Sequence, residues 1–139
     1  MPDLEPEQIV FTAFQVAPAG ALYEEEFLSL ISSVESLSRH AIAISVSKIA
    51  KLNRVPIRPV VGFQEFPNEG VGGAVEISSG LYRAVVIGKE SFIIKCGLSV
   101  PETLEVAKRR WEEENALVAL AGWDSWVRGI LRFKKEKRF

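Results

Sequence analysis

The chain has 139 residues, 47% of them hydrophobic, which is enough for one compact domain and too few for two well-packed cores. Seventeen basic and eighteen acidic residues leave a formal net charge of −1, which excludes a bulk positive field that would recruit nucleic acid or an anionic membrane. The single cysteine, Cys96, excludes an internal disulfide framework and multi-cysteine zinc sites. No apolar run approaches the roughly 20 residues of a membrane span, and no signal peptide follows Met1. The composition therefore predicts a soluble, intracellular single domain.

The first third of the chain predicts one strand and two helices. Residues 9–16 alternate loosely between apolar and polar positions and contain β-favouring Thr12, so a strand is expected, ended by Pro18 and Gly20. A helix is expected from Tyr23, because apolar residues recur there at helical spacing: Phe27, Leu30, Ile31, Val34 and Leu37. Acidic residues precede this stripe, with three glutamates in its first turn and three more acids among residues 1–7.

A second helical stripe follows through Ile42, Val46 and Ile49 and ends near Asn53. Ser36 and Ser38 lie between the two stripes and are N-cap candidates, because a hydroxyl can accept a hydrogen bond from a free helix N–H. Two helices with a break near Ser38 are therefore favoured over one long helix.

The middle and the end of the chain are rich in strand patterns. Strands are expected at 60–66, 74–77 and 81–87, with turns at 68–73 and 78–80. A short apolar segment, 91–95, precedes a second helical region. There Ser99 and Glu102 form a capping-box pattern around Pro101, opening a helix through Leu104, Ala107 and Trp111.

The chain closes with a predicted hairpin and a basic tail. Strands are expected at 116–121 and 126–133, joined by a turn at 122–124, and residues 134–139 form the tail. The order β-αα-βββ-αα-ββ predicts an α+β fold, a twisted antiparallel sheet of about six strands flanked by two helical hairpins. We expect one domain over residues 1–139, with its core at about 9–133.

Familiar catalytic motifs are missing. The sequence contains no Walker phosphate loop, no strand-to-helix GxGxxG, no nucleophile elbow, no HExxH and no CxxC. His40 is the only histidine, so a histidine-rich metal site is excluded. Three local features remain as candidate binding elements.

The first feature is Glu35 followed five residues later by His40. On one continuous helix these residues would point about 140° apart, so they can meet only if the chain breaks between them. A glutamate accepts N–H donors, and a neutral imidazole can stack on a flat ring or offer one donor and one acceptor, which together suit a purine. The alternative is a solvated helix glutamate and an ordinary histidine at a helix start.

The other two features lie at the ends of predicted strands. The segment Pro67–Gly73 contains Asn68, Gly70, Gly72 and Gly73, and glycines let a backbone approach a ligand closely, although a plain hairpin loop would use the same residues. Gly88 and Lys89 end a strand just before a helix, where free N–H groups and a lysine can bind an anion; a simple strand-to-helix turn is the alternative.

Taken in order, these features resemble the nucleotide-binding (N) domain of heavy-metal-transporting P-type ATPases, the copper, zinc and cadmium pumps. That domain carries a glutamate and a Ser-Glu-His-Pro stretch, a Gly-x-Gly-Val/Ile loop and a Val-Gly-Asn turn. Here Glu35 and Ser38-Arg-His40 are similar to the first element, Asn68-Glu-Gly70-Val71 to the second and Ile87-Gly88-Lys89 to the third. The resemblance covers about residues 9–133.

The resemblance implies that the chain binds the adenosine part of ATP. Glu35 and His40 would meet the adenine, with the remaining site residues around them: Asn68, Gly70, Val71, Gly88 and Lys89. Three of the family's residues differ here, because Ala41 replaces a proline, Asn68 a glycine and Lys89 an asparagine. We therefore expect weak, sub-millimolar to millimolar affinity.

The family's phosphorylated Asp-Lys-Thr-Gly-Thr motif is missing, so the chain alone is not expected to be catalytic. The resemblance implies a cytoplasmic domain of a membrane pump, either excised from it or free-standing, with excision favoured. It would present ATP, as Mg-ATP in the parent enzyme, to a separate phosphorylation domain beside an actuator domain. No metal binding by the domain itself, no nucleic-acid partner and no membrane insertion are expected. The alternative is a degenerate N-domain-like interaction module that has lost the nucleotide and uses Trp123, Trp126 and the basic tail to bind a partner.

Overall fold

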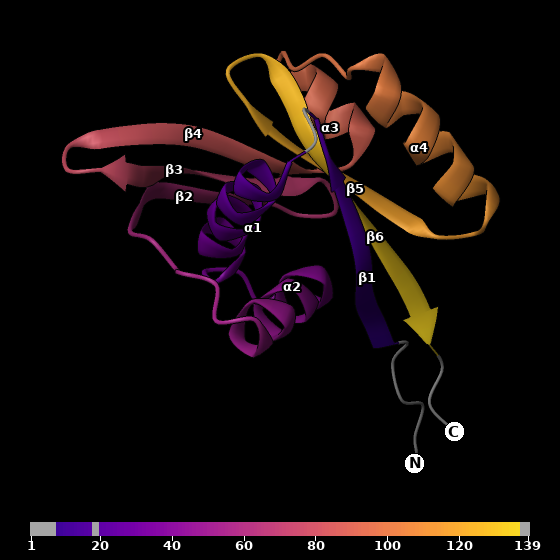
Figure 1. Cartoon of the computed structure of the whole chain (residues 1–139), viewed down its shortest axis with the longest axis horizontal. Coiled ribbons are helices and arrows are strands. Elements are labelled where there is room, and N and C mark those ends of the chain that lie inside the picture. Colours follow the sequence, from indigo (N-terminus) through magenta and orange to yellow (C-terminus); the bar gives the residue numbers. More distant parts are fainter. Residues whose placement is uncertain (1–7, 18–19, 137–139) are drawn as a thin grey trace.

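The computed structural model describes residues 8–17 and 20–136. Its six-stranded sheet is antiparallel throughout, in the order β1-β6-β5-β4-β3-β2. The strands are β1 (Gln8–Val16), β2 (Val60–Phe66), β3 (Gly70–Ser78), β4 (Leu81–Gly88), β5 (Leu117–Trp123) and β6 (Trp126–Glu136). The sheet is strongly twisted, so that β1 and β6 cross the direction of β2, β3 and β4 in Figure 1.

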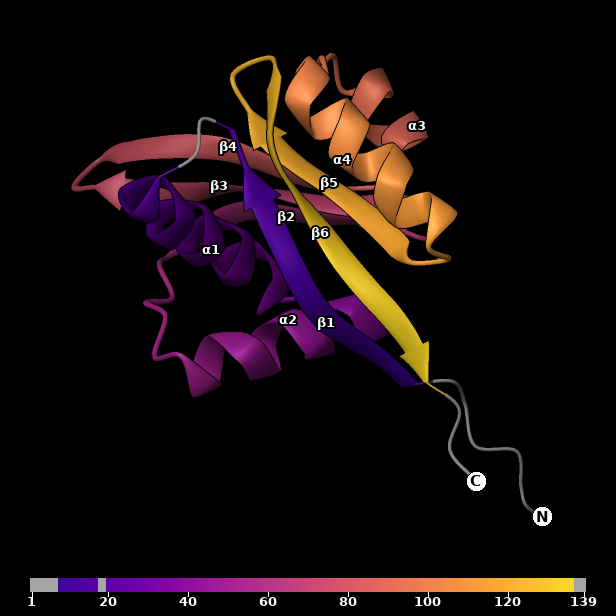
Figure 2. The same ribbon diagram turned by 45° about the vertical axis from the view of Figure 1, so that its right-hand side comes forward.

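Two pairs of helices cover opposite faces of the sheet. They are α1 (Ala21–Glu35) and α2 (Ala41–Leu52) on one face, and α3 (Glu90–Lys95) and α4 (Glu102–Glu113) on the other (Figures 1 and 2). Alternate residues of one strand face different helices: Ala119 and Ala121 of β5 pack on the α1–α2 side, and Leu120 packs on the α3–α4 side. The predicted α+β architecture is thus a sheet between two helical layers.

The break between α1 and α2 lies where the sequence predicted it, but other residues form it. Leu37 was predicted to belong to the apolar stripe of the first helix; it lies in the turn after α1, with half of its surface exposed (50%). Neither Ser36 nor Ser38 is the N-cap of α2, as had been predicted. His40 is the N-cap, because its Nδ1 accepts a hydrogen bond from the backbone N–H of Ile42 at 3.2 Å.

The glycine-rich segment is a strand where the sequence predicted a turn. The turn occupies only residues 67–69, and β3 begins at Gly70, which pairs with Gly88 of β4. Glycine has little intrinsic preference for strands. It is needed at Gly70 and Gly88 because the two backbones approach too closely for a Cβ atom.

The start of α4 also differs from the prediction. Ser99 and Glu102 do not form a capping box: Pro101 is the N-cap and no side chain caps this helix. The backbone of Ser99 instead joins the β5–β6 hairpin, donating to Ser125 O and accepting from Val127 N, both at 2.9 Å. Ser99 therefore pairs with the β5–β6 hairpin through its backbone and does not cap α4.

Both strands of the final hairpin extend further than predicted at their C-terminal ends. β5 continues through Trp123, and the turn consists of Asp124 and Ser125, both with positive φ (52° and 70°), as a type I′ hairpin requires. β6 continues to Glu136, so Lys134 and Lys135 pair with β1 and are not part of a tail. Predictions for residues 1–7, Pro18 and residues 137–139 lie outside the described residues.

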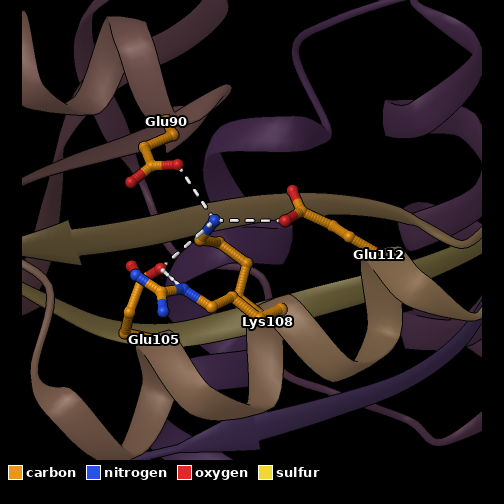
Figure 3. Close-up of polar contacts among 5 residues, drawn as sticks. Glu90, Glu105, Lys108 and Glu112 are labelled. Atoms are coloured by element: carbon orange, nitrogen blue, oxygen red, sulfur yellow. Dashed lines mark hydrogen bonds and ion pairs between the residues drawn. The ribbon is translucent and has the colours of Figure 1, made fainter.

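The α3–α4 pair is held together by a buried lysine (Figure 3). The Nζ of Lys108, a residue that is 5% exposed, lies 3.0 Å from Glu90 of α3 and 3.2 and 3.6 Å from Glu112 and Glu105 of α4. Burial by itself lowers the pKa of Lys108, but the hydrogen bonds and charges of Glu90 and Glu112 outweigh it, and the pKa is raised above 10.5. The lysine therefore stays charged and links the two helices.

Among the helices that the structure describes, none has the length and apolar character needed to cross a bilayer.

Candidate functional site

A cavity of about 230 Å³ opens where the α1–α2 turn meets the β2–β3 turn and the end of β4. All seven residues predicted for the site line it: Glu35, His40, Asn68, Gly70, Val71, Gly88 and Lys89. Its apolar wall comes from the sheet, the start of α2 and the β2–β3 turn: Ile42, Phe66, Pro67, Ile87, Leu117, Val118, Ala119 and Phe133. The break between the helices thus brings Glu35 and His40 to one cavity, as their spacing required.

Glu35 is the last residue of α1 and lies deep in this cavity, with 3% of its surface exposed. Burial, with a smaller contribution from the charge of Glu65, raises the pKa of its carboxyl group from 4.5 to about 8. Within the described part of the chain, no protein group donates a hydrogen bond to this carboxyl group. Glu35 is therefore mostly protonated at neutral pH, and it can donate as well as accept a hydrogen bond, whereas the sequence predicted an ionised acceptor.

A second carboxyl group, Glu65 of β2, lines the same cavity and was missed by the sequence analysis. Its Oε2 accepts a hydrogen bond from Ser38 Oγ at 2.9 Å, and the same hydroxyl oxygen accepts from the backbone N–H of His40 at 3.2 Å. Ser38 therefore ties the α1–α2 turn to the sheet. Finding Glu65 from sequence would have required the β2–β3 register, which places it opposite Val71.

The imidazole of His40 is exposed and faces the cavity from the start of α2. Its Nδ1 is already used as the acceptor of the helix-capping hydrogen bond. In the neutral ring the proton is then on Nε2, so His40 offers a ligand one donor and a flat face. Nδ1, the acceptor that the sequence predicted for a ligand, is therefore not available to one.

The β2–β3 turn has the geometry expected for a proline followed by a left-handed residue. Asn68 has φ of 63°, in the left-handed region that asparagine tolerates better than most residues, and Glu69 N donates to Phe66 O at 2.9 Å. These features match a type II turn with Pro67 and Asn68 at its centre.

Gly70 and Gly88 are required by the protein's own packing. A Cβ on Gly70 would collide with Ile87 O and lie 2.6 Å from the ring of Phe92; a Cβ on Gly88 would collide with Glu69 O and lie 2.8 Å from the same ring. The sequence suggested close approach by a ligand at Gly70, with a plain hairpin loop as the alternative, and the resemblance placed Gly88 in the nucleotide site. In the structure they allow two strands and Phe92 to meet beneath the cavity floor.

Lys89 follows the last residue of β4 and is the N-cap of α3, which is only six residues long. Its backbone N–H donates to Glu69 O at 3.0 Å, so this N–H is not available to an anion. Its side chain is exposed at the cavity rim. The charge of Lys89, and not its backbone, is what the site can offer to a negatively charged group.

Of the two tryptophans proposed for partner binding, Trp123 belongs to the core and Trp126 does not. Trp123 is 8% exposed, and the guanidinium groups of Arg83 and Arg128 lie 5.2 and 5.7 Å from its ring centroid. Trp126 is 49% exposed. Of the two tryptophans, only Trp126 is therefore exposed enough to contact a partner.

A wider, open hollow of about 1090 Å³ lies between β1, α1 and α2, but none of the predicted site residues borders it. It is lined by three acids and two bases, so its charge is mixed: Glu24, Glu25, Glu26, Arg54 and Arg58.

Comparisons with known proteins agree on one fold. The N-domain of HMA6, a copper-transporting P-type ATPase, superposes with a TM-score of 0.70 over 91% of this chain and 99% of the other, at 21% sequence identity. The chain has the fold of a metal-pump N-domain. A zinc-transporting PIB-type ATPase in the E2P state contains the same N-domain fold, with a TM-score of 0.76 over 94% of this chain and 20% of that protein, at 18% identity.

The N-domain fold is accompanied by sequence similarity. Copper-transporting ATPase 1 of Rhizobium meliloti (strain 1021) is 33% identical over 94 residues, which are 68% of this chain and 11% of that relative. The chain thus matches about one tenth of the length of this relative. No family model matches the sequence. The predicted α+β class and the resemblance to the N-domains of heavy-metal pumps are confirmed.

Proposed function

We propose that this N-domain fold binds the adenosine part of ATP in the cavity between Glu35, His40 and the β2–β3 turn. The observation that supports this most is the meeting of all seven predicted residues at one cavity, although they come from three separate parts of the chain. A buried, unpaired carboxyl group faces an apolar wall there, and a flat ring with polar edges complements both.

The size of the cavity suits part of a nucleotide. Its volume of about 230 Å³ is below the roughly 300–1,000 Å³ of pockets that enclose a whole drug-sized ligand. The base fits inside, where Glu35 meets its polar edge and His40 offers a ring face and the Nε2 proton. The ribose and phosphates then extend past the rim, near the exposed Lys89.

The larger role assigned by this proposal is delivery of ATP within a heavy-metal-transporting P-type ATPase. The sequence has no Asp-Lys-Thr-Gly-Thr, so the phosphoryl group, presented as Mg-ATP, goes to an aspartate in a separate phosphorylation domain, with an actuator domain beside it. Closure of the domains around the nucleotide would be the functional motion. The domain would lie on the cytoplasmic side of the membrane.

Thermal stabilisation by nucleotide tests this proposal. A ligand that binds only the folded state at about ten times its dissociation constant adds about 1.4 kcal/mol, so several millimolar ATP or ADP raises Tm by a few degrees. His40→Ala abolishes this rise. Arg39→Ala, next to His40 but not part of the cavity wall, is the matched control and keeps it.

No rise in Tm for the unmodified chain at several millimolar nucleotide contradicts nucleotide binding and supports the interaction module that has lost its ligand. A salt-sensitive affinity for oligonucleotides in the same chain would support that alternative further.

A further inference from the structure

Two glutamates share the cavity, and their surroundings differ. Glu65 lies on an exposed stretch of β2, and Ser38 donates a hydrogen bond to its carboxylate. Glu35 is 3% exposed, and within the described residues its carboxyl group has no protein donor. The Ser38 hydroxyl thus serves the carboxyl group of Glu65, whereas no comparable donor from the described residues stabilises a negative charge on Glu35.

The other charged groups around the cavity do not stabilise a negative charge on Glu35. Lys89 and His40 are exposed at its rim, and Glu69 in the β2–β3 turn adds a further acid. Lys95 forms its ion pair with Glu69, at 3.4 Å, and not with either cavity glutamate. Two ionised carboxylates facing each other across an apolar cavity are unfavourable, so the proton belongs on Glu35, the more deeply buried of the two.

We propose that Glu35, because it is buried, meets the base as a neutral carboxylic acid, and that Glu65, held by Ser38, is a positioning residue that reinforces this form. This inference rests on the proposed binding of adenine. A neutral carboxyl group presents an O–H donor beside a C=O acceptor. Adenine presents an N–H donor, its amino group, beside a ring nitrogen that accepts. The two edges match as a pair of parallel hydrogen bonds, whereas an ionised carboxylate would leave the ring nitrogen facing a negative acceptor.

The pH dependence of ATP affinity, measured between about pH 7 and about pH 9.5, tests the assignment. In this window the phosphates, with a pKa of about 6, do not change charge. The affinity of the unmodified chain is expected to fall at least fivefold as Glu35 ionises. Glu35→Gln, which keeps one donor and one acceptor at every pH, removes this dependence and retains binding. Glu65→Gln moves the fall to lower pH, because Glu35 then lacks a negative neighbour.

Deaza analogues of ATP identify the hydrogen bond itself. An ATP analogue with carbon in place of the adenine N1, or in place of N7, loses the acceptor, and one of the two is expected to bind at least fivefold more weakly than ATP at pH 7. At pH 9.5 that difference shrinks, since ionised Glu35 no longer donates.

Titration of the free protein separates this inference from the proposed function. The 13C shift of the Glu35 carboxyl carbon is expected to titrate with a midpoint well above 4.5, and Glu65→Gln is expected to lower that midpoint. If ATP binds with a flat or rising pH profile, or both deaza analogues bind like ATP, the neutral-acid inference is wrong while nucleotide binding stands. If no variant binds ATP at any pH, both are wrong. An ordinary glutamate midpoint for Glu35 in the free protein also overturns the inference.

Discussion

The buried carboxyl group of Glu35 makes the stability of this protein depend on pH. Its pKa is raised from 4.5 to about 8, first by burial and then by the charge of Glu65, so the folded chain binds a proton that the unfolded chain has released. The free energy of unfolding therefore falls as pH rises through the window from 4.5 to about 8, and this loss levels off above it.

Glu35→Gln should remove this pH-dependent loss of the free energy of unfolding. Relative to the unmodified chain, the variant is expected to gain on the order of 3 kcal/mol in stability between about pH 5 and about pH 9. Urea unfolding at both pH values measures the difference. An equal change for the two proteins between these pH values would show that Glu35 has an ordinary ionisation.

Single residues of the site were predictable from sequence to different degrees. The requirement that Glu35 and His40 meet across a helix break followed from their spacing alone. The protonation of Glu35 and the use of His40 as an N-cap did not, because both depend on which groups the folded chain places nearby. Glu65 escaped notice for the same reason, since a single glutamate in a strand carries no local signal.

At the scale of elements, the junction of β3 and β4 depends on two facing glycines. Gly70→Ala is expected to lower the free energy of unfolding by about 1–3 kcal/mol, because the added Cβ meets the backbone of Ile87 and the ring of Phe92, neither of which can move freely. Gly72→Ala in the same strand is the matched control. Its Cβ would lie 3.3 Å from a Val86 methyl group, which a small shift accommodates.

Urea unfolding of both variants without nucleotide measures this difference. Similar stabilities for Gly70→Ala and the unmodified chain would contradict the packing requirement for glycine at this position.

Most elements were predictable in number, type and order, because alternation and helical spacing are local properties of the sequence. The errors fall where tertiary contacts override local preference. The glycines of β3 look like a turn but pair with β4. Ser99 has the signature of a cap, but its backbone bonds to the β5–β6 hairpin instead.

At the scale of the whole molecule, the cavity lies where α1 and α2 meet the sheet, and residues of β2, β3, β4, β5 and β6 line it. The twisted order of the six strands brings residues 35–40, 65–71 and 87–89 together. That arrangement was available from sequence only through resemblance to a known domain, because strand order cannot be read from periodicity.

The most direct measurement is a titration of ATP into isotope-labelled protein, followed through backbone amide resonances. Binding in the cavity predicts saturable shifts centred on Glu35, His40, Gly70 and Gly88, with a dissociation constant in the sub-millimolar to millimolar range, about −4 to −5 kcal/mol. Shifts confined to the α3–α4 face or to the open hollow beside β1, with these four amides unmoved at saturation, would contradict the account.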